Sequence, residues 1–298
     1  MKVKFSFILL YLLLSGFING TDDHVKLEEQ KWIHGSVNCA NNADPLIQVV
    51  QYNADTWILR QNKCIHYEAP FLFLFVGKTK ALLVDTGATE DEAKFPLFDT
   101  VRKIIEEWET RNEINVALTV AHTHSHGDHV AGDKQFKEKP NTTVVGLTVD
   151  EIKNFFGIKN WPKDLASYDL GGREVQVIPI PGHQQSSLAF YDNTSKLFLT
   201  GDTFYPGRLY VEDWKTFRLS VERLFEFTKT HTISYILGNH IEMSTEPGID
   251  YPTGTTFQPQ EQKLPLTVDD LLELKLSLDK LGDKPSREVH DKFIIYPK

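Results

Sequence analysis

The chain has 298 residues, of which 41% are hydrophobic and 24% are charged, with 18 glycines and 14 prolines. This composition is typical of a globular protein and excludes a collagen, a coiled coil and an intrinsically disordered chain. The net charge of −9 argues against binding to nucleic acid or to an anionic membrane, and two cysteines are too few for a disulfide-dense scaffold or a four-cysteine zinc module.

The first twenty residues have the pattern of a secretory signal peptide. Lys2 and Lys4 precede an apolar stretch over residues 5–17, and small or polar residues follow at Asn19 and Gly20. The stretch is shorter than the roughly 20 apolar residues that a spanning helix needs, so we expect cleavage; an uncleaved anchor is the alternative. Residues 21–298 are then expected to form one secreted domain without a membrane span, extracellular or, in a bacterial host, periplasmic.

Export would place both cysteines of the chain in an oxidising compartment. Cys39 and Cys64 can pair there, and the closed loop would stabilise the fold by about 3 kcal/mol. Two free thiols are the alternative, because the sequence gives no distance between them.

Short apolar segments separated by turn residues predict ten strands. They cover residues 47–52, 57–59, 71–76, 81–84, 117–121, 143–146, 175–180, 188–191, 196–200 and 235–237. Apolar residues at spacings of three and four predict helices over residues 98–109, 148–156, 214–227 and 267–281. The interspersed order favours a layered α/β fold. Residues 81–85 and 197–202 both read as an apolar strand that ends in aspartate, which indicates two similar halves, each with its own sheet.

The strongest chemical signal is a histidine cluster directly after the predicted strand at residues 117–121. His124, His126, Asp128 and His129 follow the order His-x-His-x-Asp-His. Imidazole and carboxylate groups are ligands for zinc and similar ions. Alternate residues of an extended segment project to one side, so His124 and His126 can share one ion, while a turn at Gly127 would direct Asp128 and His129 toward a second. A polar surface loop without a metal is the alternative.

Three further candidate ligands each follow a predicted strand and a glycine. They are His183 after Gly182, Asp202 after Gly201, and His240 two residues after Gly238. Glycine allows a close approach of the backbone at such positions. Alone, each of the three would be read as a cap or an ordinary polar residue. Together with the histidine cluster they supply five histidines and two aspartates, which is sufficient for two metal ions bridged by a carboxylate.

These residues resemble the ordered motifs of the metallo-β-lactamase superfamily, with Asp85 in Val84-Asp85-Thr86-Gly87 as the first. The resemblance implies an αββα sandwich: two face-to-face sheets, helices outside, and metal ions at one edge. It implies that the first ion is bound by His124, His126 and His183. It also implies that the second is bound by Asp128, His129 and His240, and that Asp202 bridges the two. Asp85 would orient a ligand, or alternatively cap the end of its strand.

The resemblance implies a chemistry as well as a fold. Two divalent ions, zinc or alternatively iron or manganese, would share a hydroxide, because a metal lowers the pKa of bound water to about 7. The hydroxide would attack a small ester, thioester, lactone or lactam, with Asp128 orienting it or moving a proton. Aspartate at position 202 resembles hydroxyacylglutathione hydrolases, lactonases and phosphodiesterases more than zinc β-lactamases. We expect a secreted metal-dependent hydrolase; a phosphodiesterase of this fold and a non-catalytic extracellular metal-binding or interaction protein are the alternatives.

The segment after Asp202 is predicted to line the site and to contact substrate. Arg208 would bind a substrate carboxylate, and Tyr205 or Tyr210 would donate a hydrogen bond to the oxyanion or leaving group. The alternative is a set of packing residues on a loop. Residues 242–264 are expected to form a long loop over the metal edge. Nothing after His240 matches the glutathione-binding residues of hydroxyacylglutathione hydrolases, so a glutathione thioester is only one of several candidate substrates.

Overall fold

The computed structural model describes residues 24–298, so the predicted signal peptide lies outside the described residues. The first large sheet has six strands in the order in which they occur in the chain. They are β1 (Ile47–Asn53), β2 (Thr56–Gln61), β3 (Phe71–Val76), β4 (Lys80–Val84), β5 (Ala117–Ala121) and β6 (Thr142–Val144). Strands β1 to β4 pair antiparallel, whereas β4, β5 and β6 run parallel.

The second large sheet has five strands in the order β12-β10-β9-β8-β7. They are β7 (Ala166–Asp169), β8 (Glu174–Pro179), β9 (Leu188–Asp192), β10 (Leu197–Gly201) and β12 (Tyr235–Gly238). A third, small sheet contains β11 (Arg208–Val211), β13 (Glu288–Val289) and β14 (Ile294–Pro297). The sequence predicted two similar halves with one sheet each, and it did not predict the third sheet. Its strands have two to four residues, too few for a periodic apolar pattern.

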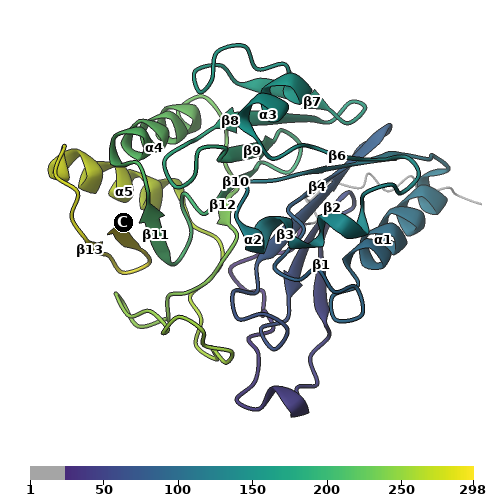
Figure 1. Cartoon of the computed structure of the whole chain (residues 1–298), viewed down its shortest axis with the longest axis horizontal. Coiled ribbons are helices and arrows are strands. Elements are labelled where there is room, and N and C mark those ends of the chain that lie inside the picture. The colour runs from purple at the N-terminus through teal and green to yellow at the C-terminus, as the bar shows by residue number, and fades with distance from the viewer. Residues whose placement is uncertain (1–23) are drawn as a thin grey trace, which may run out of the picture.

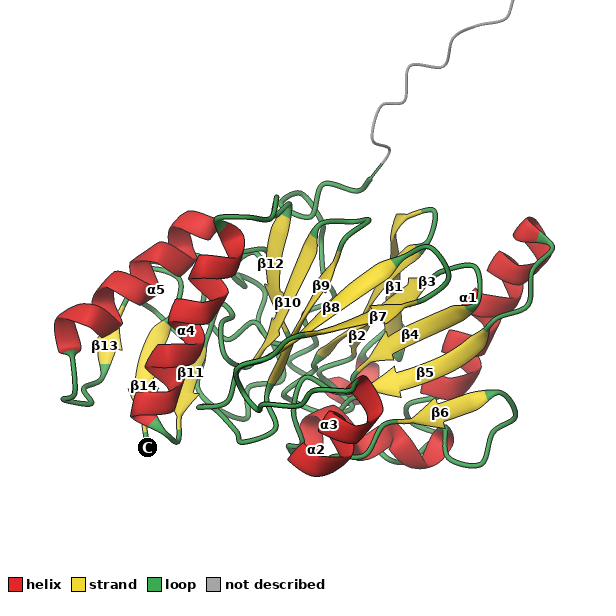
Figure 2. Ribbon diagram, turned by 90° about the horizontal axis from the view of Figure 1, so that it is seen from above, coloured by secondary structure: helices red, strands yellow, loops and turns green. Residues whose placement is uncertain are grey.

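Helices cover the outer face of each large sheet. The described residues contain α1 (Leu97–Asn112), α2 (Gly127–Val130), α3 (Val149–Phe156), α4 (Trp214–Thr228) and α5 (Val268–Leu281), with 3-10 turns at Cys39–Asn41 and Ala131–Gln135. Figure 2 shows α1 outside the first sheet and α4 with α5 outside the second. This is the predicted αββα sandwich. None of the helices in the described part of the chain has the length and apolar character needed to cross a bilayer.

Strand β3 shows how the sequence produces these layers. Side chains of a strand alternate between its two faces. Phe71, Phe73 and Phe75 belong to the core between the sheets, together with Phe190 of β9. The alternate residues of β3 belong to the core beneath α1 instead. All six residues of β3 are buried. The strand therefore reads as a continuous apolar run, because both of its faces are covered.

A buried ion pair joins the two large sheets. The Arg173 guanidinium, just before β8, donates hydrogen bonds to both carboxylate oxygens of Asp192 at 2.8 and 2.7 Å. It also donates to Thr56 Oγ1 of β2 at 2.6 Å and to the Val76 carbonyl of β3 at 3.0 Å. Burial by itself would raise the pKa of Asp192, but the hydrogen bonds and charge of Arg173 outweigh burial and lower it.

Replacing Arg173 with methionine is expected to lower the free energy of unfolding by about 3–5 kcal/mol, because the Asp192 carboxylate would remain buried without its partner. Urea denaturation measures the change. The control is Arg218→Met, which breaks a surface pair with the exposed Asp283 and is expected to cost less than about 1 kcal/mol. Equal losses in the two variants would contradict this role of Arg173.

The same pair has an expected pH dependence. Because folding lowers the pKa of Asp192, its stabilising contribution is present above the unfolded aspartate value of about 3.9. It is lost as the pH falls through the lower pKa of the folded state. The difference in stability between the wild type and Arg173→Met should therefore shrink in strong acid.

Candidate metal centre

All seven predicted ligands lie at the ends of strands along one edge of the sandwich. His124 and His126 lie between β5 and α2, and α2 carries Asp128 and His129. The other three follow β8, β10 and β12. In Figure 1, α2 lies near the centre of the view. The structure gathers the seven into two groups, within each of which the ligand atoms lie within 4.8 Å of one another: His124, His126 and His183; and Asp128, His129, Asp202 and His240.

The turns that deliver His183 and Asp202 depend on glycines. Gly182 has a φ of +138°, and a Cβ atom there would lie 2.4 Å from the Cα of Phe217. Gly201 has a φ of +54°, in the left-handed region that glycine adopts without strain. The sequence prediction that glycine permits a close backbone approach is confirmed at Gly182, whereas Gly201 permits a left-handed turn.

In the first group the three imidazoles point at one another. His126 Nδ1 lies 3.0 Å from His124 Nε2 and 3.1 Å from His183 Nε2. Ligand atoms on a tetrahedral zinc ion, with bonds of 2.0–2.1 Å, lie about 3.3 Å apart. His183 Nδ1 lies 2.8 Å from the Tyr210 carbonyl, to which it can only donate, so Nε2 keeps its lone pair for a metal. Burial lowers the pKa of His124 and of His183, which favours the neutral form that binds metal.

Apart from Asp202, the second group combines two imidazoles with a carboxylate. His129 Nε2 and His240 Nε2 each lie 3.2 Å from Asp128 Oδ2 and 3.3 Å from each other. His240 Nδ1 donates to the Glu68 carbonyl at 3.1 Å, which again directs Nε2 toward the group. Burial by itself would lower the pKa of His240, but the carboxylates of Asp202 and Asp128 outweigh burial and raise it to about 9.

Asp202 lies between the two groups. Its Oδ2 is 3.9 Å from His124 Nε2 and 3.8 Å from His183 Nε2. Its Oδ1 is 3.5 Å from His129 Nε2 and 3.4 Å from His240 Nε2. Among the described residues, this buried Oδ1 has no hydrogen-bond partner. An unpartnered buried carboxylate oxygen is costly, whereas a divalent cation would compensate it. The residues therefore fit a metal in each group, with one oxygen of Asp202 directed toward each.

Asp85 organises the backbone around the ligands. It is fully buried at the end of β4 with a φ of +68°. Its carboxylate accepts hydrogen bonds from the Thr123 amide at 2.7 Å and from the Asn239 side-chain amide at 2.7 Å. Its Oδ2 also lies 3.1 Å from His129 Nδ1. Sequence reasoning missed Thr123 and Asn239, although each stands directly before a histidine ligand.

Comparison with known proteins agrees with this geometry. Residues 69–240, more than half of the chain, match the sequence profile of the metallo-beta-lactamase superfamily. The chain belongs to the metallo-β-lactamase superfamily. Hydroxyacylglutathione hydrolase from Methylococcus capsulatus is 33% identical over 108 residues, 35% of this chain and 42% of that protein. The one from Brucella ovis is 33% identical over 105 residues, 34% and 40% of the two chains. The match thus spans less than half the length of these relatives.

Solved structures show the fold of the superfamily. TMB-1 aligns with a TM-score of 0.51 at 17% identity, over 80% of this chain and 99% of that one. The DIM-1 metallo-β-lactamase exposed to ceftazidime aligns with a TM-score of 0.52 at 13% identity, over 81% and 100%. The family match, the fold and the two groups of histidine and aspartate side chains therefore agree with one another.

The geometry around Arg208 does not support the predicted contact with substrate. Its guanidinium donates to Asp250 and to Glu242, each at 2.6 Å, and to the Tyr210 hydroxyl at 3.0 Å. The hydroxyl of Tyr205 donates to the carbonyl of Arg208 at 2.6 Å. Residues 208–211 also form β11 and not a loop. These contacts favour a structural role for all three predicted substrate residues, in which they hold the small sheet beside the metal centre.

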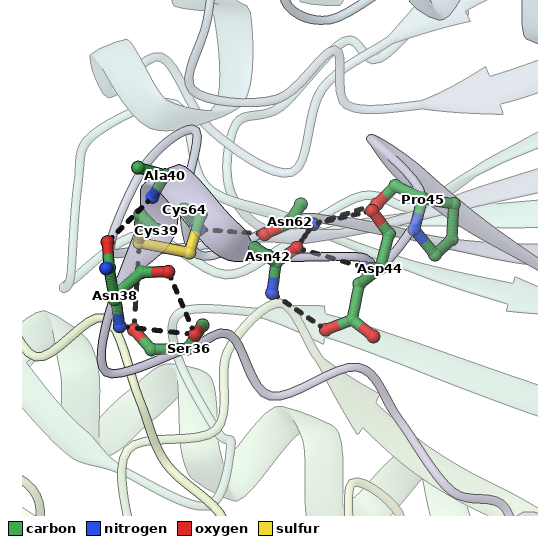
Figure 3. The surroundings of a disulfide bond; sticks show 9 residues. All are labelled: Ser36, Asn38, Cys39, Ala40, Asn42, Asp44, Pro45, Asn62 and Cys64. Atoms are coloured by element: carbon green, nitrogen blue, oxygen red, sulfur yellow. Dashed lines mark hydrogen bonds between the residues drawn. A yellow bond between two sulfur atoms is a disulfide. The ribbon is translucent and has the colours of Figure 1, made fainter.

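A disulfide anchors the loop that supports His240. Cys39 and Cys64 are bonded, with their Cα atoms 5.1 Å apart (Figure 3). Asn62 accepts from the Cys64 amide at 2.8 Å and donates to the Asn42 side chain at 2.9 Å. Cys64 lies in the loop between β2 and β3, which also supplies the carbonyl of Glu68 to His240. The disulfide therefore ties the N-terminal segment to the edge of the sandwich that carries the candidate metal centre.

Replacing both cysteines with serine is expected to lower the free energy of unfolding by about 3 kcal/mol, because the bond closes a loop between residues 25 positions apart. Thermal and urea denaturation of the oxidised protein and the variant measure the loss. Reductant should lower the stability of the wild type and leave the variant unchanged. Equal stability of wild type and variant would show that the bond adds nothing.

Proposed function

We propose that this protein is a metal-dependent hydrolase, which cleaves a small acyl substrate, an ester, thioester, lactone or lactam, with two zinc ions. The observation that carries the proposal is the position of Asp202, which has one oxygen 3.8–3.9 Å from histidines of the first group and the other 3.4–3.5 Å from histidines of the second. His124, His126 and His183 would hold one ion. Asp128, His129 and His240 would hold the other.

Bound ions would supply a water molecule of lowered pKa and would polarise the oxygen of the electrophile. The side chains of the chain prepare the site for this chemistry. The carbonyls of Tyr210 and Glu68 fix the tautomers of His183 and His240. Asp128 exposes 16% of its side chain, against 0% for His129 beside it. It is therefore the ligand best placed to orient the attacking water and to pass a proton to solvent.

The relatives support an acyl substrate. They are named hydroxyacylglutathione hydrolases, and a thioester is therefore the first substrate class to test. A panel on the zinc-loaded protein would compare a glutathione thioester, an acyl-lactone, a cephalosporin and a bis-aryl phosphodiester, each with and without chelator. Chelator-sensitive turnover of an acyl compound is expected. Turnover of the phosphodiester alone, or none on the panel with two ions bound, would contradict the proposal.

We also propose that the protein is exported as one domain, residues 21–298. The signal-like pattern of residues 1–20 and the disulfide between Cys39 and Cys64 support export, since such bonds persist in oxidising compartments. N-terminal sequencing of the protein recovered outside the cytoplasm of an expressing cell tests this. A chain that begins near Thr21 is expected. Recovery only as an intact cytoplasmic chain would contradict export.

A further inference from the structure

A small cavity of about 20 Å³ lies beside His240. Room of this size accommodates one water-sized group. The loop between β2 and β3 forms one wall, and residues of the long segment after His240 form the opposite one. One ion pair and one hydrogen bond are already complete around it: Arg208 with Glu242, and the Tyr67 hydroxyl donating to Glu68. The cavity therefore adjoins the second metal group and shares His240 with it.

Two buried polar side chains on the walls of this cavity have hydrogen-bonding capacity to which no described residue is bound. Gln258 is 5% exposed, and its side-chain oxygen has no hydrogen-bond partner among the described residues. The Lys63 side chain is 2% exposed. Its ammonium donates to the Tyr67 carbonyl at 3.1 Å and lies 3.7 Å from Glu261, which leaves one of its three protons free. The cavity thus combines a free acceptor with a free donor.

The charges around the cavity select the kind of group that fits it. The carboxylates of Glu242 and Glu261 lie close to Lys63 and disfavour a second anion. The Lys63 ammonium and the divalent ions expected at His240 disfavour a cation. An apolar group would leave both Lys63 and Gln258 without partners in a buried place. The complementary group is uncharged, accepts one hydrogen bond and donates another, as a hydroxyl or an amide does.

We propose that Lys63 and Gln258 form a specificity subsite that binds a hydroxyl or amide group of the substrate next to the second metal ion. Lys63 donates a hydrogen bond to the oxygen of that group, and the side-chain oxygen of Gln258 accepts a hydrogen bond from its O–H or N–H. Burial and the neighbouring Arg60 lower the pKa of Lys63 to about 8, so it remains a donor at neutral pH. The inference rests on the proposed acyl hydrolysis and adds the polar substituent that the substrate carries.

Matched substrates test the subsite on the zinc-loaded protein. One series joins a single thiol to butanoate and to 2-, 3- and 4-hydroxybutanoate. A second series joins butanoate to pentanethiol and to N-acetylcysteamine, which carries an amide. At least one polar member is expected to exceed its apolar counterpart by about 100-fold in kcat/KM, because a site built for a polar group rejects the analogue that lacks it. Equal hydrolysis of all members would overturn the subsite while the proposed function stands.

Gln258→Leu is expected to reduce this preference at least tenfold, and Lys63→Met to do the same. Gln260→Leu, on the exposed surface of the same segment, is the matched control and should keep the preference. Thermal melting and zinc content verify that each variant is folded and loaded. A preference retained in folded, loaded Gln258→Leu would overturn the proposal.

Binding of the cleavage products, measured by calorimetry, tests the subsite without turnover. Either a hydroxybutanoate or N-acetylcysteamine is expected to bind the wild type at least tenfold more tightly than butanoate or pentanethiol, respectively. The advantage should be lost in Gln258→Leu. Equal affinities would overturn the subsite, whereas a polar advantage without hydrolysis of any substrate would support the subsite and contradict the proposed function.

Discussion

Asp202→Asn is expected to reduce the bound metal below two ions per chain and to lower turnover by about 10³-fold or more. Asp202 directs one carboxylate oxygen toward each ligand group, and one of these oxygens is buried without another partner among the described residues. Asparagine keeps the shape but removes the charge and one of the two oxygens. A loss of about 4 kcal/mol of transition-state stabilisation, the order that a Lewis-acidic metal supplies, corresponds to this factor.

Elemental analysis after gel filtration measures the metal content of this variant, and initial rates measure its turnover. The matched control is Asp169→Asn, an aspartate at the exposed end of β7 whose side chain serves only the local turn. It should bind metal as the wild type does. Two tightly bound ions in Asp202→Asn would remove the basis for a bridging carboxylate.

Asp85→Ala is expected to weaken binding of the second metal ion by about 10–100-fold and to lower the free energy of unfolding by about 2–5 kcal/mol. The carboxylate orients His129, and groups of this kind have effects of that size on metal affinity. Its removal also takes the acceptor from buried donors, among them the Thr123 amide and one N–H of the Asn239 side chain. Each such donor costs about 1–3 kcal/mol.

Competition with a chelating dye measures the metal affinity of the Asp85 variant, and urea denaturation measures its stability. Asp213→Ala separates the two effects, because Asp213 caps α4 and its loss should cost about 1 kcal/mol without weakening metal binding. If Asp85→Ala lost stability alone, Asp85 would cap its strand without orienting His129.

The gathering of the seven candidate metal ligands could be predicted because their signals are local. Each isolated ligand follows an apolar strand and a glycine, and the histidine cluster is contiguous. The continuous apolar run of β3 likewise indicates a strand that is covered on both faces. A local pattern also lies at the start of α3, where Thr148 and Glu151 form a capping box with both of its hydrogen bonds.

Arg208 shows what the sequence alone could not reveal. Its proximity to Asp202 in the chain suggested substrate binding, but its carboxylate partners Glu242 and Asp250 lie 34 and 42 residues further along. Strand β11 pairs with β14 near the end of the chain, and such a distant pairing has no local pattern. For the same reason Lys63 and Gln258 gave no signal, since only the folded chain brings them to one cavity.

The proposed function depends most on Asp202 joining two metal ions through its carboxylate. A crystal structure of the zinc-loaded protein, with anomalous data on both sides of the zinc absorption edge, tests this claim most directly. We expect two peaks about 3.5–4 Å apart, the spacing of two-metal sites, with one oxygen of Asp202 bound to each. A single peak, or two peaks with Asp202 bound to only one ion, would contradict the account.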